Sequence, residues 1–226
     1  RHVVGLLFAE DDIRVKTAIL LLLYSGVRRG ELCGLEWRDI DFDRQMIHIN
    51  RASQYQQGKG IAEVPTKNLS SERSIKLPAV MFTVLTEYRA WWAAQKLAMG
   101  DAWVGDKDRL FTQCGGKPIN PDTINYWLGQ FIEKHSLPHF TPHSCRHTFS
   151  SLQIANGVDV RTLQARTGHA QASTLVNIYS HAIKTAVEAA SDILDDVLTP
   201  DALTPKETAR AGEGAGQFFT RHLNET

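Results

Sequence analysis

Six polar side chains have the types needed to cut a phosphodiester by transferring it to a protein hydroxyl. They are two arginines, one lysine, two histidines and one tyrosine, namely Arg28, Lys67, His143, Arg146, His169 and Tyr179. A guanidinium binds two phosphate oxygens at once and keeps its charge at every working pH. Two arginines could therefore clamp both non-bridging oxygens of one phosphate, with the histidines adding donors. A phenol has a pKa of about 10, and nearby cations lower the cost of ionising it, so a tyrosine suits the role of nucleophile.

Taken one at a time, these residues also have ordinary structural explanations. An arginine at a helix start, like Arg28, or a lysine in a turn, like Lys67, is usually a solvated surface cation. A lone histidine at position 143 would more often be a hydrogen-bonded structural residue than a catalyst. Tyr179 could be a core aromatic whose hydroxyl has a partner. The order of the six residues, rather than any single one, carries the interpretation.

That order resembles the catalytic domain of the tyrosine recombinases, the phage-integrase family. The resemblance covers about residues 8–185, and the matching segments are 26–32, 35–40, 66–67, 141–149, 167–169 and 179–181. Two places depart from the family pattern. Ser144 and Cys145 stand where an acidic residue and leucine are usual, and Thr167 stands where leucine is usual. None of these is a catalytic position, so the departures concern packing and not the chemistry.

The resemblance implies a DNA strand transferase that carries out site-specific recombination. Tyr179 would form a 3′-phosphotyrosyl link that keeps the energy of the broken ester, so no ATP, metal or other cofactor is expected. The implied partners are double-stranded DNA attachment sites, further copies of the chain in a homo-tetramer on DNA that are monomers when free, and an accessory directionality factor. No membrane is implied, and the expected location is cytoplasmic.

The resemblance also sets the expected domain organisation. Members of the family usually carry an N-terminal core-binding domain that completes a C-shaped clamp around DNA. We expect residues 1–198 to be the catalytic domain and residues 199–226 to be a linker and tail, with no core-binding domain before residue 8. The helix expected at 182–198 has an apolar side that must be buried, either on its own domain or on a neighbouring copy.

Lys67 is the residue we expect to protonate the departing 5′-oxygen. A hairpin tip can reach into a groove, and burial beside cations lets an ammonium give up its proton. Thr66 and Lys67 also match the turn motif of the family. Lys59 in the preceding turn and Lys76 inside a strand are the rivals, and a simple phosphate contact by Lys67 is the remaining alternative.

Three other functions were weighed against recombination. A type IB topoisomerase uses similar chemistry, and a non-catalytic DNA-binding regulator would use only the helices at 143–167. A metal-dependent hydrolase would use His143, His147 and His169, since a spacing of four residues on a helix suits two ligands. However, no Glu lies between His143 and His147, and two arginines nearby would repel a cation. Separately, His147 is expected to point away from the face shared by His143 and Arg146. No carboxylate cluster is apparent that would hold the ions of a two-metal nuclease.

Composition sets the outer limits of these interpretations. The chain has 226 residues, of which 42% are hydrophobic and 22% charged, so a folded core is expected and disorder is excluded for most of the length. The longest apolar run, residues 18–24, is too short to span a bilayer. The 25 basic and 25 acidic residues exclude a simple polybasic tail but allow a local basic cleft. Three cysteines do not make a disulfide scaffold.

The elements that must position these residues give an α+β fold, mainly α-helical with a small three-stranded antiparallel sheet. Hydrophobic periodicity predicts helices at 10–25, 28–35, 79–99, from 120, and at about 143–156, 159–167, 173–180 and 182–198. Strands are predicted at 46–49, 61–66 and 73–77, with turns at 57–60 and 67–71. Residues 110–111 are expected to be a short buried strand. The expected buried stripe of the long helix is Val80, Val84, Leu85, Tyr88 and Trp92.

Overall fold

The structure is a computed structural model that describes residues 2–65 and 72–168, all within the first of two compact units, Arg1–Ala186. The predicted turn at 67–71, the helices at 173–180 and 182–198, and the linker after residue 198 lie outside the described residues. Within the described ranges, no helix has the length and apolar character needed to span a bilayer.

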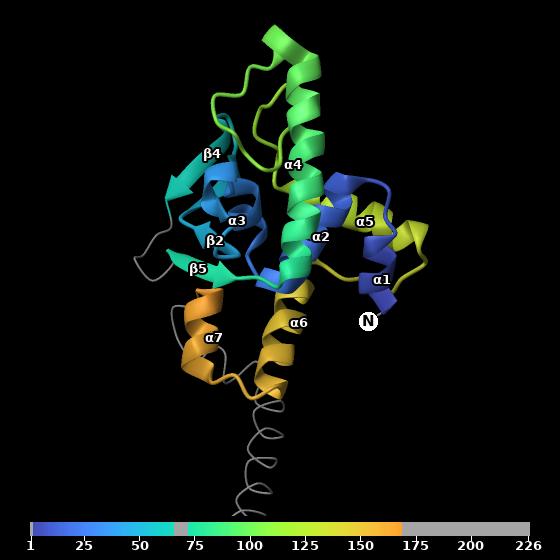
Figure 1. Ribbon diagram of the computed structural model, residues 1–226, viewed down its shortest axis with the longest axis vertical. Coiled ribbons are helices and arrows are strands. Elements are labelled where there is room, and N and C mark those ends of the chain that lie inside the picture. The colour runs from blue at the N-terminus through green and yellow to red at the C-terminus, as the bar shows by residue number, and fades with distance from the viewer. Residues whose placement is uncertain (1, 66–71, 169–226) are drawn as a thin grey trace, which may run out of the picture. The chain divides into compact units, whose positions relative to one another are not determined.

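Most of the described chain is helical (Figure 1). The helices are α1 His2–Phe8, α2 Ile13–Ser25, α3 Arg29–Gly34, α4 Ala79–Met99, α5 Asp122–Lys134, α6 Pro142–Ala155 and α7 Val160–Thr167, with short 3-10 turns at Trp37–Asp39 and Gly100–Ala102. All of the predicted helices within the described ranges are confirmed to within a few residues. Helix α1 was not predicted.

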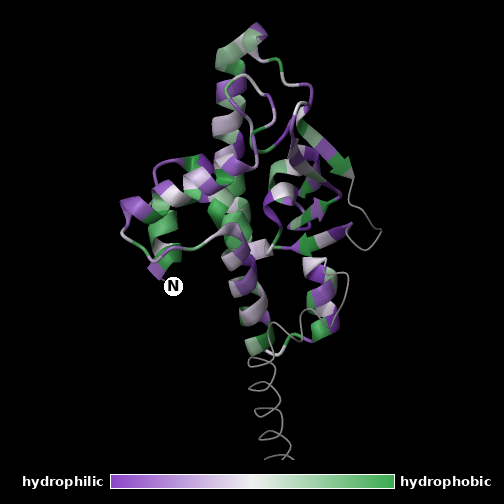
Figure 2. Cartoon of the chain, turned by 180° about the vertical axis from the view of Figure 1, so that it is seen from behind, coloured by the Kyte–Doolittle hydropathy of each residue, from purple (hydrophilic) through white to green (hydrophobic). Residues whose placement is uncertain are grey.

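Helix α2 is the centre of the fold because it is buried on nearly every side. Residues 18–22 have at most 1% of their surface exposed, and such an all-round apolar helix belongs in a core. Helices α1, α3, α4, α5 and α6 pack against it, and Figure 2 shows hydrophobic residues gathered where the central helices meet. Asp12 caps its first turn by accepting a hydrogen bond from the Arg14 N–H at 2.9 Å.

The strands form two small antiparallel sheets instead of the single sheet that was predicted. Strands β1 Ile40–Asp41, β2 Met46–Ile49 and β5 Arg73–Lys76 form one sheet in the order β1-β2-β5. Strands β3 Arg51–Gln56 and β4 Gly60–Pro65 form a separate hairpin, so the turn at 57–60 joins β3 to β4 and not β2 to β4. Strand β3 escaped prediction because its inward positions are Arg51 and Ser53, which give no apolar alternation.

Two smaller expectations about the core are corrected. Val80 was placed in the buried stripe of α4, but it is 40% exposed and Met81 is buried in its place. Viewed down the axis of α4, Met81 lies at the centre of the face formed by Leu85, Tyr88 and Trp92. Val80 lies at the edge of that face. Residues 110–111 are fully buried but are not a strand; they lie between two isolated β-bridges, and the Tyr88 hydroxyl donates to the Leu110 carbonyl at 2.6 Å.

The junction between α2 and α3 depends on one glycine. Gly26 ends α2 in the left-handed region, with φ of 63°, and its N–H donates to the Leu22 carbonyl at 3.1 Å. A Cβ at this position would overlap the ring of Phe149 on α6. The close approach of α2 and α6 therefore fixes the direction in which the chain leaves α2, two residues before Arg28.

We predict that Gly26→Ala lowers the free energy of unfolding by about 2 kcal/mol or more, because it combines a left-handed backbone with a steric overlap. Urea denaturation measures the change. Gly129→Ala is the matched control, since Gly129 lies inside α5 with nothing within 4 Å of an added Cβ. We expect the control to be neutral or to stabilise by about 0.5–1 kcal/mol. Equal effects of the two substitutions would contradict the prediction.

Candidate active site

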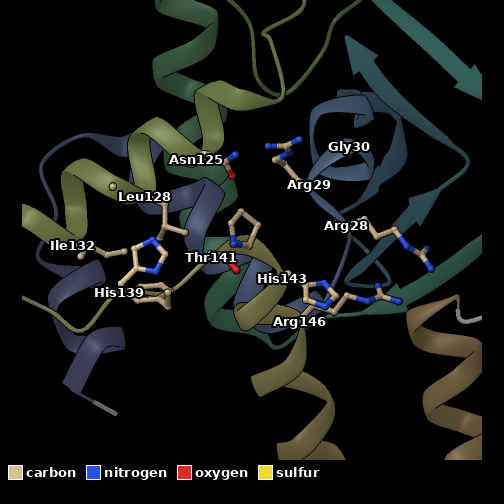
Figure 3. Close-up of a pocket in the computed structure, with 13 residues that line it drawn as sticks. Arg28, Arg29, Gly30, Asn125, Leu128, Ile132, His139, Thr141, His143 and Arg146 are labelled. Carbon is tan, nitrogen blue, oxygen red and sulfur yellow. The ribbon is translucent and has the colours of Figure 1, made fainter. Parts of the chain in front are cut away.

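One cavity of about 600 Å³ brings together three of the six residues singled out in the sequence. Arg28, His143 and Arg146 line it, between the start of α3 and helices α5 and α6. Figure 3 shows these three side chains at one end of the cavity, with Leu128, Ile132 and His139 at the other. Lys67, His169 and Tyr179 lie outside the described residues. The catalytic roles of all six stay predictions.

Arg28 is held by both its backbone and its side chain. It is the N-cap residue of α3, and its N–H donates to Oε2 of Glu31 at 2.8 Å. Its Nη1 donates to Oε1 of the same carboxylate at 2.8 Å, and its Nη2 donates to the Gly168 carbonyl at 2.8 Å. The side chain is still 45% exposed. Arg28 is therefore oriented by protein contacts while one side of the guanidinium faces the solvent.

Arg146 lies deeper, one turn along α6. That helix begins with a capping box, in which the Thr141 hydroxyl accepts from the Ser144 N–H at 3.1 Å and the Ser144 hydroxyl accepts from the Thr141 N–H at 3.3 Å. The Arg146 guanidinium donates to the Gly26 carbonyl at 2.7 Å and to the Thr167 carbonyl at 2.6 Å. Only 4% of the residue is exposed. Arg146 thus ties the ends of α2 and α7 to α6.

A third arginine, Arg73 on β5, belongs to the same cluster and was missed by the sequence analysis. It donates to both oxygens of Glu31, at 3.1 Å from Nη1 and 2.7 Å from Nη2, and its Nε donates to the Arg166 carbonyl at 2.8 Å. Its side chain is 5% exposed. A signal was available, because alternate residues of a strand share a face and Arg73 shares one with the buried Ile75. An arginine on the inner face of a strand indicates a buried acidic partner.

The C-terminal end of α7 is the meeting point of these arginines. Three consecutive carbonyl oxygens each accept from a different guanidinium, in the pairs Arg166 with Arg73, Thr167 with Arg146 and Gly168 with Arg28. The last carbonyls of a helix lack partners within the helix and form the negative end of its dipole, so cations stabilise them. Gly168 has φ of 68°, and a Cβ there would lie 3.0 Å from Nη1 of Arg73. Both the left-handed backbone and the close approach of Arg73 therefore favour glycine at this position.

Glu31 balances the positive charge of this cluster, a role that the sequence alone does not indicate. Only 4% of its side chain is exposed, and its carboxylate is shared between Arg28 and Arg73. Burial on its own raises the pKa of the carboxyl, but the hydrogen bonds and charge of Arg73, together with the Arg28 N–H, outweigh burial and hold the pKa below its ordinary value of 4.5. Glu31 is consequently ionised at neutral pH.

His143 is paired with His147, one turn along α6. The two Nε2 atoms are 2.8 Å apart, so one ring donates to the other, and the ring centroids are 4.4 Å apart. The expectation that His147 points elsewhere is wrong, because a spacing of four residues stacks two side chains on one helix face. Burial, followed by the charges of His143 and Arg146, lowers the pKa of His147. Residues 2–65 and 72–168 contain no cluster of three His, Cys, Asp or Glu side chains able to hold a metal ion.

The arrangement is suited to binding an anion with several oxygens. Arg28 offers a half-exposed guanidinium and His143 an exposed imidazole, and the buried Arg146 lines the same cavity. Guanidinium donors are already oriented by Glu31 and by the end of α7, so little side-chain freedom remains to be lost when an anion binds. Phosphate and carboxylate groups are the anions that guanidinium donors bind in this way.

We predict that Glu31→Gln lowers the free energy of unfolding by about 3 kcal/mol at neutral pH, since it removes one side of a buried ion pair. The folded-state pKa of Glu31 is depressed, so its stabilisation is present above 4.5 and is lost as the pH falls through the folded-state value. The difference in free energy of unfolding between the variant and the parent chain should therefore become smaller as the pH falls. Urea denaturation over a pH series measures this. Glu87→Gln on the exposed face of α4 is the control, and a pH-independent difference for Glu31→Gln would refute the prediction.

Comparison with known proteins places this geometry in a family. The model of the phage integrase family matches residues 6–185. A tyrosine recombinase XerC-like protein of Caldanaerobacter subterraneus subsp. tengcongensis is 28% identical over 195 residues, which cover 81% of this chain and 50% of the relative. The ICEBs1 integrase of Bacillus subtilis strain 168 is 26% identical over 194 residues, covering 85% of this chain and 51% of the relative. The chain thus spans about half the length of these relatives.

The fold is also shared with a solved structure. The integrase of transposon Tn1549, in complex with transposon right end DNA, superposes with a TM-score of 0.72 at 24% identity, over 85% of this chain and 63% of that one. The mainly helical architecture with small antiparallel sheets is therefore an established fold. Since the family model extends over most of the sequence, the chain belongs to the phage integrase family.

Proposed function

We propose that this chain cuts and rejoins DNA in site-specific recombination, through a 3′-phosphotyrosyl intermediate on Tyr179. The observation that carries the proposal is the convergence of Arg28, Arg146 and His143 on one cavity, with both arginines bonded to the turn that leads into His169. Similarity to a tyrosine recombinase XerC-like protein and to the ICEBs1 integrase supports it.

The chemistry divides among these residues according to the charge that develops. Arg28 and Arg146 would bind the non-bridging oxygens of the scissile phosphate, with His143 and His169 as further donors. Each such donor contributes on the order of 3 kcal/mol to transition-state stabilisation. Tyr179 would attack phosphorus as the bond to the 5′-oxygen breaks. The product ester keeps the energy of the broken bond, so the reverse attack by a 5′-hydroxyl needs no ATP and no cofactor.

The partners and domains follow the same proposal. The substrate is a double-stranded attachment site, on which four copies assemble from free monomers, and an accessory factor sets directionality. Residues 1–198 act as the catalytic domain and residues 199–226 as linker and tail. The reaction takes place in the cytoplasm of a bacterium or of a phage-infected cell.

The nucleophile gives the first test. We expect Tyr179→Phe to fold and bind DNA normally but to form no covalent complex, because only the attacking hydroxyl is lost. The assay incubates the chain with DNA from the flanks of its gene, in EDTA, and detects the protein–DNA band on a denaturing gel. Tyr126→Phe, at an exposed position on α5, is the matched control and should give the normal band. An adduct formed by Tyr179→Phe would remove Tyr179 from its role, and an adduct formed only with a divalent ion would favour the hydrolase alternative.

The general acid gives the second test. If Lys67 donates the proton to the 5′-oxygen, Lys67→Ala should lower the rate of cleavage of ordinary DNA by about 100-fold or more relative to the parent chain. A substrate with sulfur at the bridging 5′ position should largely restore the rate, because a thiolate leaves without a proton. Lys59→Ala in the β3–β4 turn is the control and should cleave both substrates at the parent rate. Equal loss by Lys67→Ala on both substrates would make Lys67 a phosphate-binding residue and not the acid.

A further inference from the structure

Arg73 occupies an unusual place for a residue outside the predicted catalytic set. Its side chain is 5% exposed, and its guanidinium donates along two directions at once. One direction leads to both oxygens of Glu31, at 3.1 and 2.7 Å, and the other leads to the Arg166 carbonyl at 2.8 Å. If Arg73 served only to neutralise a buried charge, its ion pair with Glu31 would be sufficient. The bond to the Arg166 carbonyl would then have no purpose.

The first of these contacts determines how much positive charge Arg28 presents. The Glu31 carboxylate accepts from Arg28 as well as from Arg73. If Arg73 were absent, the single negative charge of Glu31 would be balanced by Arg28 alone, and the attraction of Arg28 for a phosphate would fall. Arg73 supplies the compensating charge, which allows Glu31 to orient Arg28 without neutralising it.

The second contact fixes the end of α7. Arg73 bonds to the carbonyl of Arg166, and the Arg166 guanidinium returns to the Lys76 carbonyl on β5 at 3.3 Å and to the Gln153 side chain on α6 at 2.8 Å. Strand β5 and helix α7 are therefore joined by two arginines that donate in opposite directions. Arg73 lies six residues after Lys67, and Arg166 lies three residues before His169.

We propose that Arg73 is a positioning residue for the strand-transfer reaction, which keeps Arg28 cationic through Glu31 and holds the α7 end from which the chain runs to His169. The inference rests on the proposed function. It assigns no contact between Arg73 and the DNA: its action passes through Glu31 and through the Arg166 carbonyl.

A buried ion pair elsewhere in the fold provides the comparison. Arg51 on β3 is 10% exposed and pairs with Asp39 and Glu36, away from the residues that line the cavity. A purely structural role for Arg73 would make the two pairs equivalent. Removing either pair would then destabilise the fold without a specific effect on the reaction.

The first measurement is the rate of covalent adduct formation per folded molecule, on DNA from the flanks of the gene. We expect Arg73→Met to lower the rate by about 100-fold, with the DNA dissociation constant changed by less than about threefold. The double variant Glu31→Gln with Arg73→Met leaves no unpaired buried charge, so it guards against unfolding. It should recover about tenfold of the lost rate, because Arg28 is no longer neutralised. The matched pair, Asp39→Asn with Arg51→Met, should react at the parent rate.

The pH dependence separates positioning from simple packing. Among the described residues, the charged groups that face Glu31 are Arg28 at the start of α3 and Arg73 on β5, while the end of α7 contributes carbonyl oxygens. Without Arg73, burial raises the pKa of Glu31, and protonation as the pH falls releases Arg28. The rate of Arg73→Met relative to the parent should therefore rise as the pH is lowered from 8. A ratio that does not change with pH, together with no recovery in the double variant, would overturn the inference.

A measurement without DNA tests whether Arg73 holds the end of α7. The Gly168 amide donates to the Gln164 carbonyl at 2.8 Å at the end of α7. Its hydrogen exchange should accelerate by about tenfold or more in Arg73→Met, whereas the His135 amide at the end of α5 should exchange as before. Unchanged exchange at Gly168 would refute the link to α7. If the parent chain itself forms no adduct, the proposed function fails, and the exchange result still decides whether Arg73 holds α7.

Discussion

A single buried carboxylate determines how the walls of the cavity are arranged. Glu31 is almost fully removed from water, and a buried charge is tolerated only when partners replace its hydration. Its partners come from the start of its own helix and from a strand more than forty residues further on, in Arg28 and Arg73. Because Glu31 is ionised, the fold must bring Arg73 on β5 within hydrogen-bonding distance of Glu31 on α3. Both arginines then have one side committed to Glu31, and one further donor of each reaches the end of α7.

That helix end is the second half of the same constraint. A helix terminus leaves carbonyl oxygens without partners, and a buried terminus needs donors from elsewhere. Three guanidiniums supply them at residues 166–168, and they come from three different elements, β5, α6 and the segment before α3. Elements far apart in the sequence are thus joined through polar contacts, and two of the arginines that make them, Arg28 and Arg146, line the cavity. The position of the α7 end, up to Gly168, is held by this network.

Local patterns predicted the helices well and the strands less well. The spacing of His143 and Arg146 places both on the first turns of α6, and the periodicity of each long helix is regular enough to be read directly. Strand β3 escaped because arginine and serine occupy its inward positions. Arg73 and Glu31 escaped as site residues for a related reason. A buried ion pair is a property of two distant positions at once, whereas each position alone resembles an ordinary charged surface residue. The same holds for His147, whose role depends on the ring it touches.

The charge of the described cluster agrees better with a transition state than with a bound substrate. Three guanidiniums, of Arg28, Arg73 and Arg146, and one carboxylate, of Glu31, leave two net positive charges in this cluster, although the whole chain has a formal net charge of zero. A phosphodiester carries one negative charge, and attack by a phenolate adds a second. Charge stabilisation that increases as the reaction proceeds lowers the barrier, whereas stabilisation that is equal in both states does not. In the reaction proposed here, the negative charge of Glu31 weakens the attraction of the cluster for the ground-state phosphate. The positive charge of Arg73 compensates for Glu31, so the cluster keeps the extra positive charge that stabilises the transition state.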